Sequence, residues 1–174
     1  YNYSAMSTHV AINYAIHKVG KDYEKLLKEI FTDHVGVKDT VHFMKVSWSS
    51  KDIVKGSQRY SFFATSEDYL RIAKTIMNDY HSDSCIGDYL RNIYDNRVDK
   101  KKKQDDTKSV FAYTKQYGGQ FHMSLRGTKN VVFAMDGYAG QQILIDMTSG
   151  RIVIVHSIDR HYNWQKIVYK VIKN

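Results

Sequence analysis

Apolar residues recur every three or four positions in several stretches of the first hundred residues, and this spacing predicts amphipathic helices. The expected helices cover 7–20, 22–36, 69–80 and 86–94. We expect Ser7 or Thr8 to cap the first helix and Asp22 to cap the second. The expected apolar face of the first helix contains Val10, Ala11, Tyr14, Ala15 and Val19. Before the third, Thr65 and Asp68 have the serine-or-threonine to acid spacing of a capping box. Residues 37–60 show no sustained period, which indicates loops with short strands.

From Val110 the pattern changes to short β-branched runs separated by turn residues, which predicts successive antiparallel strands. The expected strands cover 120–125, 131–135, 141–147 and 151–157. A last helix is expected to cover this sheet with one apolar face made of Trp164, Ile167, Val168, Val171 and Ile172. The order predicts an α+β fold. A mainly helical region over 1–109 precedes a sheet with its C-terminal helix over 110–174, and together they form one incomplete domain.

Composition narrows the classes of function. The 174 residues are 43% hydrophobic, enough for one folded domain, and no apolar run approaches the roughly 18 residues of a membrane span. The net charge of +8 would suit a polyanion, but its densest basic run, Lys100 to Lys103, lies in a polar stretch over 95–108 that we expect to be a solvated surface loop. No zinc-finger, helix-turn-helix or RNA-binding signature accompanies this charge, so we expect no nucleic-acid partner.

Cysteine and histidine give little support for metal chemistry. Cys85 is the single cysteine, so no internal disulfide can form. The eight histidines include no His-Glu-x-x-His motif. His81 and Cys85 share a helical spacing, but two ligands do not make a catalytic zinc site. We therefore expect neither a metal nor a cofactor.

The most distinctive stretch of the chain is 137–157. Gly137 and Gly140 bracket two residues just before an apolar run, and Gly150 lies in the turn that separates this run from the next. Gly150 supplies the positive φ that a short hairpin turn needs. Glycines at the start of a strand let a ligand approach the backbone closely. We expect a β-hairpin whose first strand borders a binding site.

Short motifs along the chain resemble those of the penicillin-recognising serine hydrolases, in the same order. They are YNYSA at 1–5, VGKDY at 19–23, IFTDHVGVKDT at 30–40, FATSEDY at 63–69, YGG at 117–119 and GYAGQ at 137–141. The series is similar to that of class C β-lactamases, esterases of that fold and 6-aminohexanoate-oligomer hydrolases. The resemblance implies the C-terminal part of a β-lactamase-like fold.

The same resemblance implies a chemistry for particular residues. In this family a serine attacks an amide or ester carbonyl to form an acyl-enzyme, and a lysine three residues later helps to remove the proton of the serine. By position, Tyr3 would take part in proton transfer and the backbone N–H of Gln141 would stabilise the oxyanion. The substrate pocket would include Tyr138, Ala139, Gly140 and Tyr117. A packed tyrosine without a catalytic role is the alternative for Tyr3.

Two residues depart from the β-lactamase pattern. Ala5 stands where β-lactamases have asparagine, and Tyr138 stands where the family has lysine or histidine. Both changes remove groups that would bind a β-lactam. A small-molecule amide or ester is therefore the expected substrate, although an ordinary strand aromatic is an equal alternative for Tyr138.

The nucleophile itself is absent from this sequence. No serine is followed by lysine three positions later, and no Gly-x-Ser-x-Gly motif occurs. We expect the chain to be the C-terminal portion of the hydrolase, inactive alone, with the missing N-terminal segment of the same protein as its partner. The alternative is a non-catalytic binding or interaction module on the same scaffold. A periplasmic and a cytoplasmic location both stay open.

Overall fold

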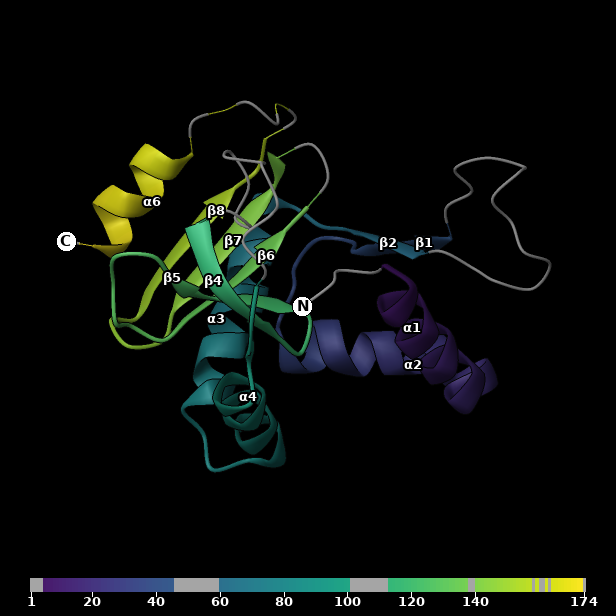
Figure 1. Ribbon diagram of the computed structural model, residues 1–174. Coiled ribbons are helices and arrows are strands. Elements are labelled where there is room, and N and C mark those ends of the chain that lie inside the picture. Colours follow the sequence, from purple (N-terminus) through teal and green to yellow (C-terminus); the bar gives the residue numbers. More distant parts are fainter. Residues whose placement is uncertain are drawn as a thin grey trace. The chain divides into compact units, whose positions relative to one another are not determined.

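The structure is a computed structural model that describes residues 5–45, 60–100, 113–137, 140–157, 159, 162 and 164–173 (Figure 1). Its described residues fall into two compact units. The N-terminal unit extends to Ile72, and the C-terminal unit begins at Ala73. The expected boundary between residues 109 and 110 lies outside the described residues.

Helices make up most of the N-terminal unit. Its elements are α1 (Ala5–Val19), the 3₁₀ turn η1 (Gly20–Asp22), α2 (Tyr23–Leu27), the π-helical segment η2 (Lys28–His34), β1 (His42–Lys45), β2 (Tyr60–Phe63) and the first turns of α3 (Ser66–Tyr80). These positions confirm the helices expected over 7–20, 22–36 and 69–80. Gly36, at φ 73°, ends the second helical segment in the left-handed region that glycine adopts readily.

The details of the first two helices differ from expectation. Ser7 and Thr8 lie inside α1 and do not cap it. Asp22 precedes α2 but makes no side-chain capping hydrogen bond. Val10 and Tyr14 are 63% and 65% exposed, whereas the partly buried apolar side chains of α1 are Ile12, Ile16 and Val19. Apolar residues stand on every side of this helix, so spacing alone did not identify the buried stripe.

Aromatic rings hold the β1–β2 hairpin against the helices of the N-terminal unit. The two strands pair antiparallel, with His42 opposite Phe63. The ring of Phe43 in β1 stacks on Tyr60 in β2 at 5.1 Å between centroids, and Phe62 stacks on Phe31 at 4.9 Å. Strand β1 lies within 37–60, where short strands were expected, whereas β2 begins only at the last residue of that stretch.

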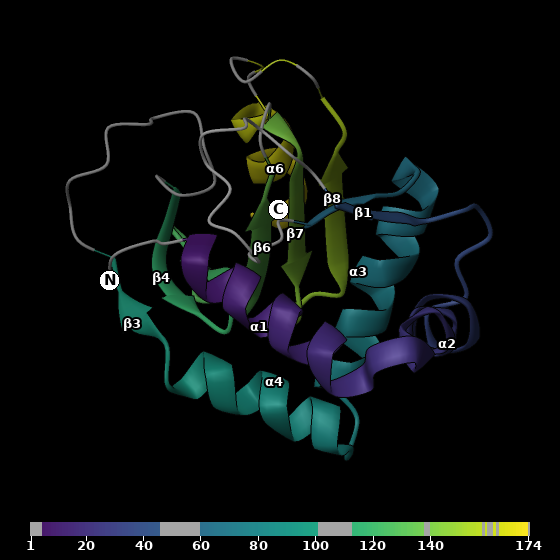
Figure 2. The same ribbon diagram turned by 90° about the vertical axis from the view of Figure 1, so that its right-hand side faces the viewer.

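The C-terminal unit is an antiparallel sheet with helices. Its elements are the end of α3, α4 (Cys85–Asp95), β3 (Val98–Asp99), β4 (Thr114–Gly118), β5 (Phe121–Leu125), β6 (Val132–Asp136), β7 (Gln142–Asp146), β8 (Arg151–Val155) and α6 (Gln165–Ile172). The six strands follow one another as a meander in the order β3-β4-β5-β6-β7-β8 (Figure 2). The α+β class is thus confirmed, and the four expected strands lie within two residues of their predicted bounds.

Two strands of this sheet are not among the expected ones. The stretch over 95–108 was expected to be a surface loop, but Val98 pairs with Tyr117 and Asp99 with Gln116. Both side chains of β3 are exposed, so its pairing rests on the backbone and leaves no apolar pattern in the sequence. In β4 the buried positions are Thr114 and Tyr117, which are not apolar aliphatic residues.

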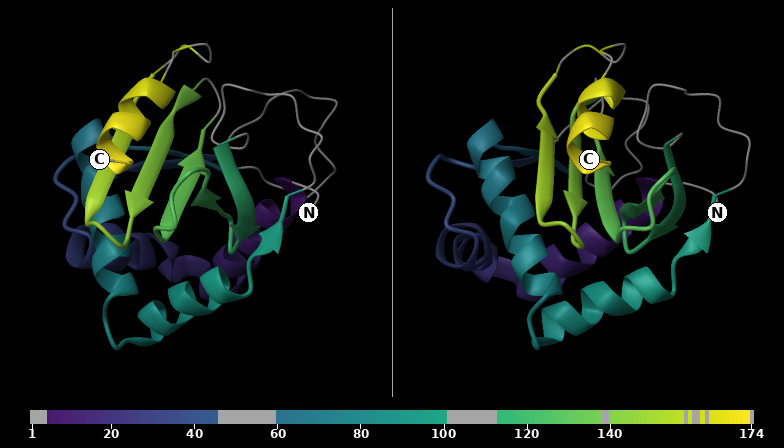
Figure 3. Two further views of the ribbon diagram at one scale, coloured as in Figure 1. Left: turned by 60° about the vertical axis from the view of Figure 1, so that its left-hand side comes forward. Right: turned by 90° about the vertical axis from the view of Figure 1, so that its left-hand side faces the viewer.

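The main core lies between one face of the sheet and α6 (Figure 3). Three residues of α6 and the turn before it, Trp164, Val168 and Ile172, are buried against strand residues Leu125, Val132, Ala134, Leu144, Val153 and Val155. The predicted apolar face of this helix is confirmed at these three positions. It is wrong at Ile167, which is 41% exposed.

The opposite face of the sheet is covered by aromatic side chains. Phe133 of β6 meets the rings of Tyr80 from α3, Tyr94 from α4 and Phe121 from β5, at centroid distances of 5.7, 5.7 and 5.2 Å. Because neighbouring residues of a strand point to opposite faces, Phe133 and Ala134 let β6 contribute to both layers.

Replacing Ile172 with alanine should lower the free energy of unfolding by about 2 kcal/mol or more, because Ile172 is 2% exposed in the core. Ile167→Ala, on the same helix, is the matched control and should change it by less than about 1 kcal/mol. Urea unfolding followed by circular dichroism measures both. Equal losses in the two variants would contradict the assigned packing of α6.

Candidate functional site

The turn between β6 and β7 contains the glycine motif. The N–H of Gly137 donates to the carbonyl oxygen of Gln141 at 2.9 Å, and the N–H of Gly140 donates to the carbonyl oxygen of Gly137 at 3.4 Å. Gly140 has a φ of 96°, a conformation that side-chain-bearing residues rarely adopt. These bonds close a short turn and fix the backbone where Gln141 leads into β7.

The side chain of Gln141 links this turn to the segment that follows β8. Its Nε2 donates to the carbonyl oxygen of Ser157 at 2.7 Å, which joins the start of β7 to the chain just after β8. A Cβ atom added at Gly137 would lie 3.0 Å from both Cβ and Oε1 of Gln141. Glycine at 137 therefore makes room for the side chain that holds the turn.

The predicted site residues are only partly brought together. Gly140 and Gln141 lie in this turn, whereas Tyr3, Tyr138 and Ala139 lie outside the described residues. Tyr117 is buried in β4, and its hydroxyl donates to Oε1 of Gln120 at 3.2 Å. Strands β5 and β6 separate β4 from β7, and the register places Tyr117 in line with Leu144, three residues past Gln141. The structure therefore leaves Tyr117 apart from the turn.

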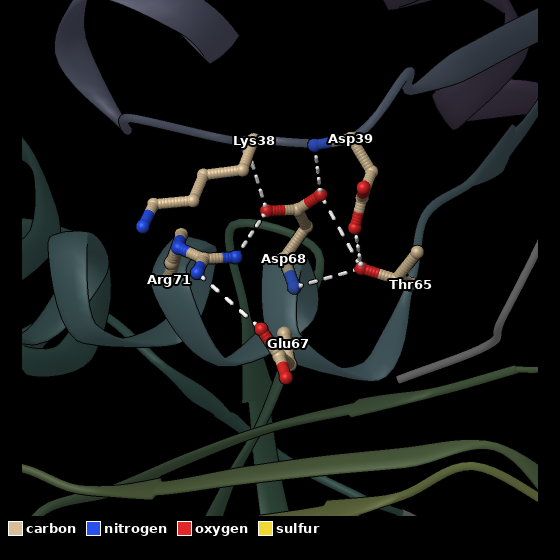
Figure 4. A network of polar contacts seen from close by, with 6 residues as sticks. All are labelled: Lys38, Asp39, Thr65, Glu67, Asp68 and Arg71. Atoms are coloured by element: carbon tan, nitrogen blue, oxygen red, sulfur yellow. Dashed lines mark hydrogen bonds and ion pairs between the residues drawn. The ribbon is translucent and has the colours of Figure 1, made fainter.

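A buried carboxylate joins two of the family-like motifs in the N-terminal unit (Figure 4). Asp68 of α3 accepts hydrogen bonds from the backbone N–H groups of Lys38 and Asp39, each at 3.0 Å. The guanidinium of Arg71 lies 2.7 Å from the same carboxylate. Thr65 Oγ1 accepts from the N–H of Asp68 at 3.2 Å, which confirms the threonine half of the expected capping box. The motif at 63–69 thus binds the end of the motif at 30–40.

The environment of Asp68 keeps it charged. Burial by itself raises the pKa of the carboxyl, but the N–H of Lys38, the guanidinium of Arg71 and the N–H of Asp39 together bring it below its usual value. Asp68 has no exposed surface. A carboxylate so fully engaged acts as a clamp between chain segments and does not serve as an acid or base.

A second cluster of titratable groups lies on β3, β4 and β5. Lys100 directly follows β3, and its Nζ donates to Oγ1 of Thr114 in β4. The same Nζ lies 2.7 Å from Nδ1 of His122 in β5. Thr114 and His122 are buried, and Lys100 is partly buried. The basic run that was expected to be solvated therefore begins with a residue packed on the sheet.

Burial changes the ionisation of this cluster. It lowers the pKa of Lys100 to about 7, against the attraction of Asp136 and with the repulsion of Arg126. Burial, followed by the charge of Lys100, lowers the pKa of His122 to about 3. Near neutral pH the imidazole is therefore uncharged while the amine titrates. Sequence reasoning missed this site because nothing in the pattern of a basic run marks one lysine as packed.

One buried polar atom beside the glycine turn lacks a partner. Gln142, the first residue of β7, donates from Nε2 to Oδ1 of Asp136 at 2.6 Å. Its Oε1 is buried and accepts no hydrogen bond from the residues that the structure describes. Buried acceptors are rarely left unpaired in native proteins, so this atom marks the start of β7 as a place for a donor group.

The described ranges contain neither a candidate metal site nor a candidate membrane-spanning helix. No group of three histidine, cysteine, aspartate or glutamate residues among them could hold a metal ion. Within the same residues, none of the helices combines the length and the apolar character that crossing a bilayer requires. The sequence placed His81 and Cys85 at helical spacing as two possible metal ligands. In the structure, Nε2 of His81 lies 2.8 Å from the carbonyl oxygen of Met147.

Asp68→Asn should lower the free energy of unfolding by about 1–3 kcal/mol at neutral pH, because an amide cannot accept all the hydrogen bonds of the carboxylate. The pKa of Asp68 is lowered by folding, so its charge stabilises the protein above the unfolded pKa of about 3.9. The difference between wild type and variant should shrink as the pH falls below about 4. Urea titrations at several pH values measure it.

Glu67→Gln is the matched control for this prediction. Glu67 also contacts Arg71, at 3.4 Å, but its side chain is exposed to solvent. A surface ion pair of this kind contributes little, so stability should not change measurably. If Asp68→Asn behaved like Glu67→Gln, the clamp would not stabilise the N-terminal unit.

Lys100→Met should remove part of the pH dependence of stability between pH 7 and 9. An unfolded lysine binds its proton up to a pH near 10.4, whereas Lys100 in the folded protein releases it near pH 7. The unfolded state therefore binds more protons in this window, and the wild type gains stability as the pH rises. Lys74→Met, at an exposed position, should keep the wild-type slope. Parallel curves for wild type and Lys100→Met would contradict the assigned burial.

Comparisons of the chain with models of known protein families, with curated proteins and with solved structures found no match. The described elements form an α+β protein with a six-stranded antiparallel sheet and a C-terminal helix.

Proposed function

We propose that this chain is the C-terminal portion of a serine hydrolase with a β-lactamase-like fold, which cleaves a small amide or ester through an acyl-enzyme. The ordered series of motifs is the observation that carries the proposal. The clamp at Asp68 supports it, because this carboxylate binds two of those motifs to each other across about thirty residues of chain. Motifs matched by chance have no reason to be in contact.

The glycine turn supplies the proposed oxyanion donor. In this mechanism the serine Oγ attacks the substrate carbonyl, and the negative charge that develops on the carbonyl oxygen is stabilised by backbone N–H groups. The N–H of Gln141 is one of these. The hydrogen bonds that close the turn and tie Gln141 to Ser157 hold its backbone in place before the substrate arrives. Such preorganisation is what oxyanion stabilisation requires.

Tyr3 is the proposed proton-transfer group. A free phenol has a pKa near 10, so it needs a neighbouring cation to act as a base at neutral pH. The lysine three residues after the serine is that cation, and Tyr3 then passes a proton to the leaving group. Water releases the acyl group in the second half of the reaction, which returns the serine to its starting state.

The proposed substrate is an ester, peptide or linear amide. Ala5 and Tyr138 replace the polar groups that a β-lactamase uses for the amide and carboxylate of its substrate. A pocket built with these residues binds a less polar acyl group in preference to a β-lactam. Tyr117, buried in β4 some distance from Gln141, is not part of the pocket proposed here.

An N-terminal segment of the same protein is the proposed partner. The sheet supports this, because β8 is the last strand in the order and has no further strand beside it among the described residues. An edge made of Arg151–Val155, rich in β-branched residues, is suited to pairing with another strand. The unsatisfied Oε1 of Gln142 also accommodates a donor from an added segment.

A non-catalytic binding module on the same scaffold is the second candidate. The observation that favours it is the absence of Ser-x-x-Lys from this sequence, together with the replacements at Ala5 and Tyr138. The two candidates differ in one feature. The hydrolase requires a Ser-x-x-Lys motif encoded upstream of Tyr1, and the binding module does not.

The isolated 174-residue chain should hydrolyse no p-nitrophenyl ester, whereas a longer protein with an upstream Ser-x-x-Lys should hydrolyse it. In that longer protein, Tyr3→Phe should lower kcat by about 100-fold or more, because it removes a proton-transfer group. Tyr14→Phe changes an exposed tyrosine of α1 and should keep full activity. Steady-state kinetics measure the difference.

Two results would count against the hydrolase. One is an upstream coding sequence without Ser-x-x-Lys, which would favour the binding module. The other is a Tyr3→Phe variant as active as Tyr14→Phe, which would remove Tyr3 from the mechanism. Ester hydrolysis by the isolated chain would contradict the claim that its nucleophile lies elsewhere.

A further inference from the structure

The cluster of Lys100, Thr114 and His122 takes no part in the proposed hydrolysis. It is built on β3, β4 and β5, while the glycine turn leads into β7. Thr114 and His122 lie on the paired strands β4 and β5, and Lys100 directly follows β3, which pairs with β4. The pairing of these strands therefore fixes how far apart the three residues lie. The primary amine of Lys100 is therefore held at a fixed place beside Thr114 and His122.

The geometry brings the amine against two uncharged groups. Lys100 Nζ donates to the hydroxyl of Thr114 and lies 2.7 Å from Nδ1 of His122. An imidazolium and an ammonium cannot share so short a contact, so the ring is neutral while Lys100 is an ammonium, and Nδ1 then accepts from it. His122 is also packed edge-on against the ring of Tyr117, at 5.1 Å between centroids. Burial and the repulsion of Arg126 favour the neutral amine, whereas the attraction of Asp136 favours the ammonium.

The reactivity of the amine follows from this environment. Because the pKa of Lys100 is about 7, roughly half of the molecules carry a neutral amine at neutral pH. An ordinary lysine, with a pKa near 10.4, is neutral in fewer than one molecule in a thousand. Partial burial of a lysine is one of the ways in which proteins prepare an amine for covalent chemistry with carbonyl compounds. Lys100 as a whole is only partly buried.

We propose that Lys100 is an imine-forming residue that binds small aldehydes covalently, with Thr114 and His122 positioning its nitrogen. The lone pair of Nζ attacks the aldehyde carbon, and the carbonyl oxygen takes a proton to give a carbinolamine. The C–O bond then breaks, and the oxygen leaves as water with the second proton from the nitrogen. The products are one imine and one water, and no electrons are gained or lost. Both protons pass from the nitrogen to the oxygen through solvent, and Nδ1 of His122, 2.7 Å from Nζ, holds the nitrogen in place.

The test is reductive trapping of the folded 174-residue protein with propanal and sodium cyanoborohydride between pH 6 and 10. Peptide mass spectrometry measures modification of Lys100 against Lys74 and Lys166, two exposed lysines of the same molecule. Ratios within one sample cancel the pH dependence of the reductant. At pH 7, Lys100 should react about tenfold faster or more, because its larger neutral fraction outweighs its lower basicity. This ratio should fall as the pH rises toward 10.

The proposal would be overturned if, at pH 7, Lys100 were modified no faster than Lys74 and Lys166. Lys100→Arg should abolish the rapid phase of modification, and the peptide ratios in the wild type decide the question even if this variant fails to fold. Thr114→Val keeps the shape of the side chain and removes the acceptor of the ammonium, so the midpoint of the pH–rate profile should move to lower pH. An unmoved midpoint would overturn the role of Thr114. None of these readouts depends on the hydrolase proposal.

Discussion

Burial of β7 on both of its faces is the constraint on which the C-terminal unit depends. All five residues of this strand are buried, and it pairs with β6 on one side and β8 on the other over its whole length. Leu144 enters the core under α6, while Ile143 and Ile145 face the opposite layer. A shift of this strand by one residue would exchange the side chains of its two faces and disrupt the packing of both layers. The backbone at Gln141, just before β7, inherits this rigidity.

Hydrogen bonds to a buried carboxylate fix the chain in the N-terminal unit. Its helices and hairpin contribute aromatic contacts, but the loop after Gly36 is held to α3 by the carboxylate of Asp68. These two bonds pair the backbone N–H groups of Lys38 and Asp39 with a carboxylate that has no exposed surface. The two units thus use different devices, an enclosed strand in one and a buried charge in the other, to fix the segments that carry the family-like motifs.

Periodicity predicted the elements whose side chains are sorted by burial. Strands β5 to β8 and the helices α3, α4 and α6 have apolar residues at regular spacing, and the sequence located them closely. It did not locate β3, because two exposed residues paired through their backbone leave no pattern. It chose the wrong face of α1, where apolar residues such as Val10 and Ile12 point in different directions.

The candidate site was predictable to the extent that it is local in sequence. Gly140 and Gln141 lie together because they are neighbours in one turn. The separation of Tyr117 from Gln141 depends on the order of strands, which short motifs do not encode. The contact between Lys100 and His122 likewise depends on which strands pair. Distances across a sheet follow from topology, and a single sequence carries no direct record of it.

The central proposal is that this chain is part of a serine hydrolase whose nucleophile lies upstream. A fluorophosphonate probe reacts with activated serines, so labelling the longer protein and locating the modified residue by mass spectrometry tests this claim most directly. The account predicts one labelled serine, in a Ser-x-x-Lys motif before Tyr1, and no label on the 174-residue chain alone. A label on a serine within residues 1–174, or no label on the longer protein, would contradict it.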